Sequence, residues 1–189
     1  MRKKSSNLAY LIAAAGGLAV VIAAWLLRDN PAFRPIVGGS EAPAFTANTL
    51  DGQPRSLEDF GDKVVLLNIW ATWCPPCIEE LPSMQRLYEA LQGEPFEIVA
   101  VSVDATLGQA DPDGKIGGNV GEFVRSFGLT FPILHDPGGE IRYTYKTTAL
   151  PESFLIRRDG IVHRKVSGGT EWDTPAWIEE IRRLMDEGD

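Results

Sequence analysis

The sequence predicts an α/β fold with a mixed central sheet flanked by helices, an N-terminal β-hairpin extension and one transmembrane helix before the domain. Two observations lead to this fold class. Apolar strand-like runs alternate with helical patterns and end in a hairpin, which is typical of a mixed sheet covered by helices. The stretch from Leu8 to Leu27 carries no charged residue, and as a helix it would span about 30 Å, the thickness of a bilayer's hydrocarbon core. The chain therefore divides into a basic cytoplasmic tip (1–7), a transmembrane anchor (8–27), a linker (28–43) and one domain (44–189).

The residues before the apolar stretch predict its orientation. Arg2, Lys3 and Lys4 precede it, and basic residues stay on the cytoplasmic side of a membrane. The alternative is a cleaved signal peptide, because Ala13 to Ala15 could act as a cleavage site, although the apolar run continues well past it. We expect a single-pass protein of the cytoplasmic membrane whose domain lies on the extracytoplasmic, periplasmic side.

The first half of the domain is predicted from one turn signal and two apolar patterns. Asp51-Gly52 is a strong hairpin turn, and the run VVLLNIW at 64–70 is typical of a strand buried on both faces. After it, apolar residues recur every three or four positions, as on one face of a helix that Pro82 would kink. That face consists of Leu81, Met84, Leu87, Tyr88 and Leu91. The expected elements are strands at 44–48 and 53–56, a helical turn at 57–60, a strand at 64–70 and a helix from 76 to about 92.

The second half repeats the alternation and ends in a hairpin. Asp159-Gly160 supplies the hairpin turn, and Asp173-Thr174-Pro175 caps the last helix with proline in its first turn. The last helix is expected to bury Trp177, Ile178, Ile181 and Leu184. The expected elements are strands at 96–103, 131–134, 153–157 and 161–166, a helix at 120–127, a helical turn at 141–145 and a final helix after 175.

The segment Trp70-Ala71-Thr72-Trp73-Cys74-Pro75-Pro76-Cys77 contains the only two cysteines of the chain. It lies between the predicted buried strand and the next helix, where a C-x-x-C redox site would stand. A redox cysteine attacks as a thiolate, and a helix N-terminus stabilises an anion through its free N–H groups and its dipole. We therefore predict Cys74 as the exposed nucleophile and Cys77 as the sheltered cysteine that resolves the mixed disulfide. Trp73 would give an apolar shoulder for a partner chain.

Two other roles for the cysteine pair are less consistent with the sequence. A structural disulfide across three residues closes a tiny loop and constrains the unfolded chain little. A zinc site would need two more ligands, and neither His135 nor His163 has the spacing of a zinc finger. We expect no metal and no cofactor.

From about Pro43 to its C-terminus, the sequence resembles a known family. The motif at 70–77, Asp51-Gly52, the segment 150–156 (LPESFLI) and Asp159-Gly160 are similar to features of the membrane-anchored thioredoxin-like thiol:disulfide oxidoreductases of the TlpA, ResA and DsbE (CcmG) group. The resemblance implies a thioredoxin-like fold and reduction of disulfides in other proteins. By analogy, it also implies substrates in cytochrome c maturation or respiratory oxidase assembly, and electrons from a transmembrane thiol carrier of the DsbD or CcdA kind.

The resemblance also implies two further site positions. It places a cis proline at Pro151, facing the dithiol, with the backbone of Leu150 pairing with a bound substrate strand. It matches Glu80 to a functional glutamate of ResA-like proteins. Because Asn68 stands where thioredoxin carries a buried aspartate, Glu80 is the main candidate to exchange protons with the thiols. The alternative for Glu80 is a solvated helical glutamate like Glu79.

The loop from Asp104 to Asn119 is longer than a usual connection between a strand and a helix. It leaves the carboxyl end of a strand parallel to the one that feeds Cys74, so it should lie on the active-site edge. We expect a specificity loop for the partner protein, and a tolerated surface insertion is an equally open interpretation. Asp111-Pro112-Asp113-Gly114 lacks the spacing of a calcium loop and is interpreted as a turn.

The net charge of the chain and the residues and spacing around its cysteines argue against three other functions. The net charge of −8 and the pI of about 4.8 argue against nucleic acid as a partner. A peroxiredoxin-like peroxidase is one alternative, but it would need threonine where Ala71 stands. A Sco-like metal chaperone is another, but it would need C-x-x-x-C and a partnering histidine. The sequence favours an anchored, extracytoplasmic thiol:disulfide oxidoreductase that acts on disulfide-bearing proteins.

Overall fold

The computed structural model describes residues 4–28 and 35–187, which form two compact units. The first unit contains helix α1 (Lys4–Arg28), which includes the predicted apolar stretch. Within the described ranges, no helix reaches the length and apolarity needed to cross a membrane. The anchor at 8–27 therefore stays a prediction. The charges at Arg2 and Lys3, and linker residues 29–34, lie outside the described residues.

The second unit begins at Ile36 and contains a mixed sheet of seven strands in the described part of the chain. The strands are β1 (Thr46–Thr49), β2 (Pro54–Ser56), β3 (Val64–Trp70), β4 (Phe96–Ser102), β5 (Ile133–His135), β6 (Glu152–Ile156) and β7 (Val162–Ser167). Their spatial order is β2-β1-β5-β4-β3-β6-β7. The strands β3, β4 and β5 are parallel, and the other pairs are antiparallel. The predicted α/β class with a mixed sheet and an N-terminal hairpin is confirmed.

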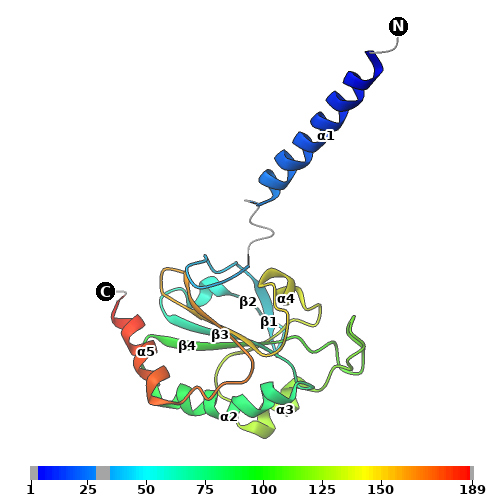
Figure 1. The fold of residues 1–189 in the computed structure, drawn as a ribbon. Coiled ribbons are helices and arrows are strands. Elements are labelled where there is room, and N and C mark those ends of the chain that lie inside the picture. The colour runs from blue at the N-terminus through cyan, green and yellow to red at the C-terminus, as the bar shows by residue number, and fades with distance from the viewer. Residues whose placement is uncertain (1–3, 29–34, 188–189) are drawn as a thin grey trace. The chain divides into compact units, whose positions relative to one another are not determined.

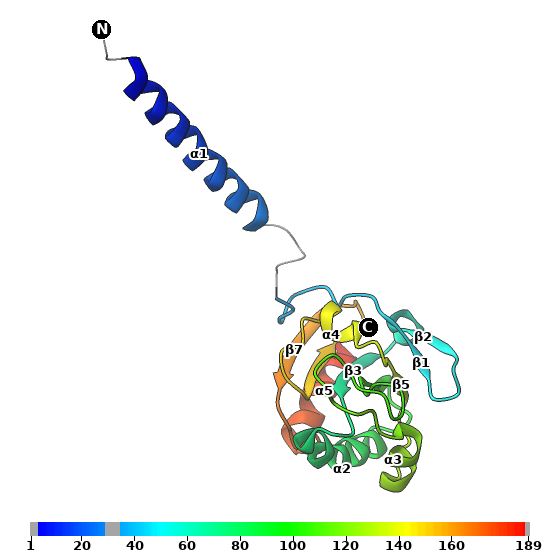
Figure 2. The same cartoon turned by 90° about the vertical axis from the view of Figure 1, so that its right-hand side faces the viewer.

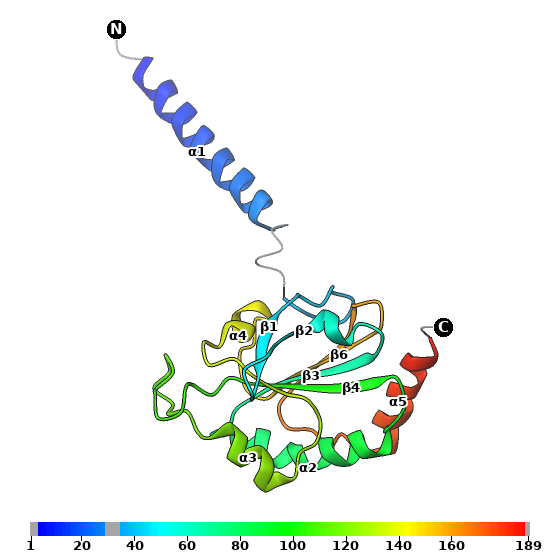
Figure 3. The same ribbon diagram turned by 180° about the vertical axis from the view of Figure 1, so that it is seen from behind.

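Helices cover both faces of this sheet. They are α2 (Pro75–Ala90), α3 (Val120–Phe127), α4 (Glu140–Thr144) and α5 (Pro175–Asp186), and a 3₁₀ helix, η2, spans Leu57–Phe60. Figures 1 and 3 show α2, α3 and α5 on one face and α4 on the other, and Figure 2 shows the β1–β2 hairpin at one edge. Because both faces are covered, every residue of β3, β4 and β6 is buried.

The register of the central strands positions the site. Strand β3 ends at Trp70, beside the end of its parallel neighbour β4 at Ser102. Both strands thus deliver the residues that follow them to the same edge of the sheet. On the other side of β3, Asn68 pairs with Ser153 of β6. A polar side chain within a buried strand therefore faces a polar partner rather than the apolar core.

Most predicted bounds agree with the structure to within one or two residues, and β3 and α3 agree at both ends. Strand β5 is displaced from the predicted 131–134 to Ile133–His135. Pro132 has no N–H to donate, so the ladder is interrupted there, although its carbonyl oxygen still accepts from the N–H of Ala100 at 3.0 Å.

Helix α2 begins at Pro75 rather than Pro76 and contains Pro82, as predicted. In α5, Ile181 and Leu184 are buried, whereas Trp177 and Ile178 are only half-buried.

Candidate dithiol active site

Cys74 and Cys77 form a disulfide at the N-terminus of α2, with their Cα atoms 5.3 Å apart. Cys74 is the N-cap residue, and its Sγ accepts a hydrogen bond from the backbone N–H of Cys77 at 3.3 Å. This N–H belongs to the helix's unpaired first turn, so Cys74 sits where an anion is stabilised. Pro75 and Pro76 lack N–H groups and suit the first turn.

The two cysteines differ in exposure less than the sequence predicts. Cys77 is 0 % exposed, which fits a resolving cysteine, but Cys74 is only 4 % exposed rather than openly accessible. The sulfur of Cys74 is covered on one side by its own disulfide partner in this oxidised state. The order of exposure agrees with the prediction, and the expected open exposure of Cys74 is wrong for the disulfide form.

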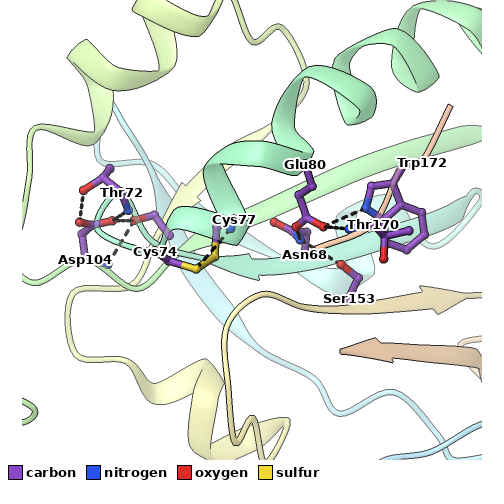
Figure 4. The surroundings of a disulfide bond; sticks show 10 residues. Asn68, Thr72, Cys74, Cys77, Glu80, Asp104, Ser153, Thr170 and Trp172 are labelled. Carbon is purple, nitrogen blue, oxygen red and sulfur yellow. Dashed lines mark hydrogen bonds between the residues drawn. A yellow bond between two sulfur atoms is a disulfide. The ribbon is translucent and has the colours of Figure 1, made fainter. Parts of the chain in front are cut away.

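Glu80 is buried in a polar cluster rather than solvated. Its side chain is 2 % exposed, and its Oε1 accepts from Asn68 Nδ2 at 2.7 Å. Its Oε2 accepts from the backbone N–H of Thr170 at 3.1 Å and from Trp172 Nε1 at 3.2 Å. The same Nδ2 of Asn68 donates to Ser153 Oγ at 2.9 Å. Figure 4 shows this cluster on one side of the disulfide.

Burial changes the acidity of Glu80. Desolvation raises the pKa of Glu80 from its ordinary 4.5 to about 7, although hydrogen bonds from Asn68, Trp172 and Thr170 oppose the rise. The acid and its carboxylate are then both populated near neutral pH. A group of this kind can take up or release a proton beside the dithiol.

The Leu150–Pro151 peptide bond is cis, as the resemblance implies. Because Glu152 pairs with Ile69 of β3, Pro151 lies at the edge from which β3 leads to the dithiol. The carbonyl oxygen of Pro151 accepts from the N–H of Gly168 at 2.9 Å. The next residue, Gly169, lies so close to the start of α2 that a Cβ there would stand 3.0 Å from the carbonyl oxygen of Pro76. The roles of Leu150, Pro151 and Trp73 in substrate binding stay predictions.

The loop from Asp104 to Asn119, which we call the arm, contacts Thr72 and Trp73, the two residues before the dithiol. Its base is attached to Thr72 through Asp104, whose Oδ2 accepts the Thr72 N–H at 2.8 Å. Further along, the ammonium of Lys115 lies 5.7 Å from the ring centroid of Trp73. Leu107 and Ile116 are 63 % and 59 % exposed. The arm thus lies on the active-site edge, as predicted, with two large apolar side chains in solvent.

For several residues of the site, no pattern in the sequence predicts a role. These are Thr72, Asp104, Ser153, Thr170 and Trp172. Asp104 and Thr72 could have been paired by noting that each follows the end of a strand in a parallel pair. The contact of Glu80 with Thr170 and Trp172 joins α2 to a loop that follows β7, and no local spacing predicts it.

Comparisons with known proteins agree with this geometry. Residues 38–165 match the model of the AhpC/TSA family. The thiol-disulfide oxidoreductase ResA of Bacillus thuringiensis subsp. konkukian is 42% identical over 130 residues, which cover 69% of either chain.

Two solved structures are similar over nearly their whole length. A thiol:disulfide interchange protein of the thioredoxin family from Chlorobium tepidum TLS has a TM-score of 0.61 and 27% identity, covering 78% of this chain and 97% of that one. StoA from Bacillus subtilis has a TM-score of 0.56 and 27% identity, covering 77% and 98%. The fold is therefore thioredoxin-like, as the resemblance implies, and Cys74 and Cys77 form its redox pair. The chain belongs to the AhpC/TSA family and, within it, to the thioredoxin-like thiol:disulfide oxidoreductases that include ResA.

Proposed function

We propose that this oxidoreductase reduces disulfides in other proteins on the extracytoplasmic side of the cytoplasmic membrane. The observation that carries the proposal is the position of Cys74, whose Sγ accepts the Cys77 N–H at the start of α2. After reduction, the same N–H and the helix dipole would stabilise a Cys74 thiolate. A thiolate at the N-terminus of a helix, with a second cysteine one turn on, is suited to two-step exchange.

The reaction transfers two electrons from the dithiol to the substrate. The Cys74 thiolate attacks one sulfur of the substrate disulfide, forms a mixed disulfide and expels the first substrate thiolate, which takes a proton from solvent. The Cys77 thiolate then attacks the sulfur of Cys74, forms the Cys74–Cys77 disulfide and expels the second substrate thiolate. The structure holds the enzyme at the end of this cycle, in its oxidised form.

Glu80 is the proposed proton acceptor for Cys77. It lies three residues further along α2, on the same side of the helix. Cys77 must lose its proton before it attacks, and Glu80, whose pKa burial raises to about 7, accepts a proton readily in its ionised form. The apolar surroundings of Cys77 would otherwise favour its neutral thiol.

We propose the arm as the docking element for the protein substrate. Leu107 and Ile116 expose apolar surface on the arm, and Lys115, next to Ile116 in the chain, lies over the Trp73 ring. Leu107 also forms a bridge with Gly117, so the two ends of the segment between them lie close together. A deletion there can be closed without stretching the chain.

Deleting residues 107–117 is expected to slow reduction of a protein disulfide about tenfold while sparing a small disulfide. The arm supplies contacts that only a protein partner can use, and loss of a few such contacts is worth about 1.4 kcal/mol, a factor of ten. Insulin and oxidised glutathione serve as the two substrates. The double variant Leu107→Ser with Ile116→Ser keeps the arm backbone and should reproduce most of the loss. Equal slowing of both substrates would count against docking by the arm.

The electron donor is proposed to be a transmembrane thiol carrier of the DsbD or CcdA kind, and the substrates to be proteins of cytochrome c maturation or respiratory oxidase assembly. Similarity to ResA supports this proposal. The test is to express Cys77→Ala in cells, where the mixed disulfide with Cys74 cannot be resolved, and to identify the trapped proteins by mass spectrometry. Cys74→Ala is the matched control and should trap none of them. Capture of cytoplasmic proteins alone would contradict the proposal.

Residues 8–27 are proposed as an uncleaved anchor. The full chain should sediment with membranes and resist extraction by carbonate, whereas a chain that starts at Ile36 should be released and keep its activity on oxidised glutathione. This expectation follows because the described domain from Ile36 onward contains the whole dithiol site. A mature N-terminus near residue 16, found by mass spectrometry, would instead identify a cleaved signal peptide.

A further inference from the structure

Asp104 is a buried acid that the exchange reaction does not use. It stands two residues beyond the end of β4 and is fully buried. Its Oδ2 accepts from the backbone N–H of Thr72 and from Ser102 Oγ, both at 2.8 Å. Its Oδ1 accepts from Thr72 Oγ1 at 2.5 Å and from the N–H of Gly118 at 3.3 Å. Figure 4 shows Asp104 and Thr72 on the opposite side of the disulfide from Glu80.

The four donors come from three separate segments of the chain. Thr72 belongs to the turn between β3 and α2, Ser102 ends β4, and Gly118 lies near the far end of the arm. Among the described residues, Asp104 forms no ion pair with a lysine or arginine, and its carboxylate is satisfied by neutral donors alone. Neutral donors at fixed positions define a geometry more closely than a mobile cation does.

Thr72 fixes the backbone that leads to Cys74. The N–H of Cys74 donates to the carbonyl oxygen of Ala71 at 3.2 Å, so the residues from Ala71 to Cys74 form one tight turn. Asp104 holds the second residue of that turn through both its N–H and its hydroxyl. On the other side, a Cβ on Gly118 would stand 2.6 Å from Thr72 Oγ1, so this contact requires glycine.

We propose that Asp104 is a positioning residue for the nucleophile: its carboxylate locks the turn from Ala71 to Cys74 and ties that turn to the end of the arm. The angle at which the Cys74 sulfur meets a substrate disulfide then depends on a contact outside the C-x-x-C motif. Exchange requires three sulfur atoms nearly in line, so a small displacement of the attacking atom is costly.

Several charged groups surround the turn that Asp104 holds. Asp104 and Glu80 are two of the buried carboxylates, Lys115 lies over Trp73, and His135 Nε2 contacts the carbonyl oxygen of Asp104 at 2.8 Å. The other nearby ionisable groups are Asp136, which follows β5, and the ion pair of Glu152 with Lys165.

Removing the charge of Asp104 favours a neighbouring anion and would lower the pKa of Cys74. On the high-pH plateau, where the thiol is already ionised, a lower pKa therefore acts only through the weaker nucleophilicity of the thiolate.

The test is the pH profile of the reduced enzyme reacting with the small disulfide 5,5′-dithiobis(2-nitrobenzoate). In Asp104→Asn we expect the rate on the high-pH plateau, where Cys74 is fully ionised, to fall about tenfold or more. A fall of one unit in the thiol pKa reduces the intrinsic rate of a thiolate only about threefold. A tenfold loss of the plateau rate would therefore show that the Cys74 sulfur is displaced. Asp62→Asn, an exposed change before the start of β3, should leave the profile unchanged. A plateau within twofold of the parent, in a variant with parental near-ultraviolet circular dichroism, would overturn the proposal.

If Asp104→Asn does not fold, two substitutions at Thr72 test whether the bonds to Asp104 position Cys74. Thr72→Val keeps the side chain's shape but removes the hydroxyl donor, and it should lower the plateau about threefold. Thr72→Ser keeps both donors and should restore the parental plateau. An unchanged plateau in a folded Thr72→Val protein, or equal loss in both variants, would show that the bonds to Asp104 do not position Cys74.

Discussion

Replacing Cys74 by serine is expected to abolish disulfide reduction, with a loss on the order of 10³-fold or more. The serine hydroxyl keeps the N-cap hydrogen bond from Cys77 N–H, so the fold should persist. It does not ionise near neutral pH, however, and it cannot form a disulfide with the substrate. Insulin reduction, followed by turbidity in the presence of dithiothreitol, gives the measurement.

Cys77→Ser is the matched variant that separates the two sulfurs. It should keep the first attack and accumulate the mixed disulfide between Cys74 and the substrate, but it should not turn over. Alkylation at neutral pH should be much faster at Cys74 in the Cys77→Ser protein than at Cys77 in the Cys74→Ser protein. If the faster thiol proves to be Cys77, the assignment of nucleophile and resolving cysteine is reversed.

Replacing Glu80 by glutamine is expected to remove a pH-dependent part of the protein's stability. The pKa of Glu80 is about 7 in the folded protein and near 4.5 in the unfolded chain. Between these values the folded state holds a proton that the unfolded state releases, so the free energy of unfolding falls as pH rises. The contribution is fully present below pH 4.5 and is lost by about pH 7, a change on the order of 3 kcal/mol.

The measurement is urea unfolding of the oxidised enzyme between pH 4.5 and 8. The parent should lose stability over this range relative to Glu80→Gln, and Glu79→Gln, an exposed change on the same helix, should follow the parent. Parallel curves for the parent and Glu80→Gln would show that Glu80 keeps an ordinary acidity. In the reduced enzyme, thiol titrations that do not respond to Glu80→Gln would remove Glu80 from the proton transfer.

Local patterns in the sequence already determined much of this protein. The uninterrupted apolar run of β3 predicts a strand buried on both faces, and its bounds at Val64–Trp70 agree with the structure. The C-x-x-C motif directly before a helical pattern places Cys74 at an N-cap, which the structure confirms. These features depend on residues close together in the chain, whose periodicity and capping act locally.

The surroundings of the dithiol were decided by the tertiary structure. Glu80 owes its raised pKa to burial, and two of its hydrogen-bond donors, Thr170 and Trp172, lie about ninety residues further along the chain. Asp104 reaches Thr72 only because β3 and β4 are parallel and in register. Residue type alone could not distinguish Glu80 from the exposed Glu79, since acidity and hydrogen bonding depend on which distant segment excludes water from the group. The sequence thus determined the reacting sulfurs and the elements that carry them, whereas packing between distant segments decided which acids surround them, because desolvation and side-chain hydrogen bonds exist only once those segments meet.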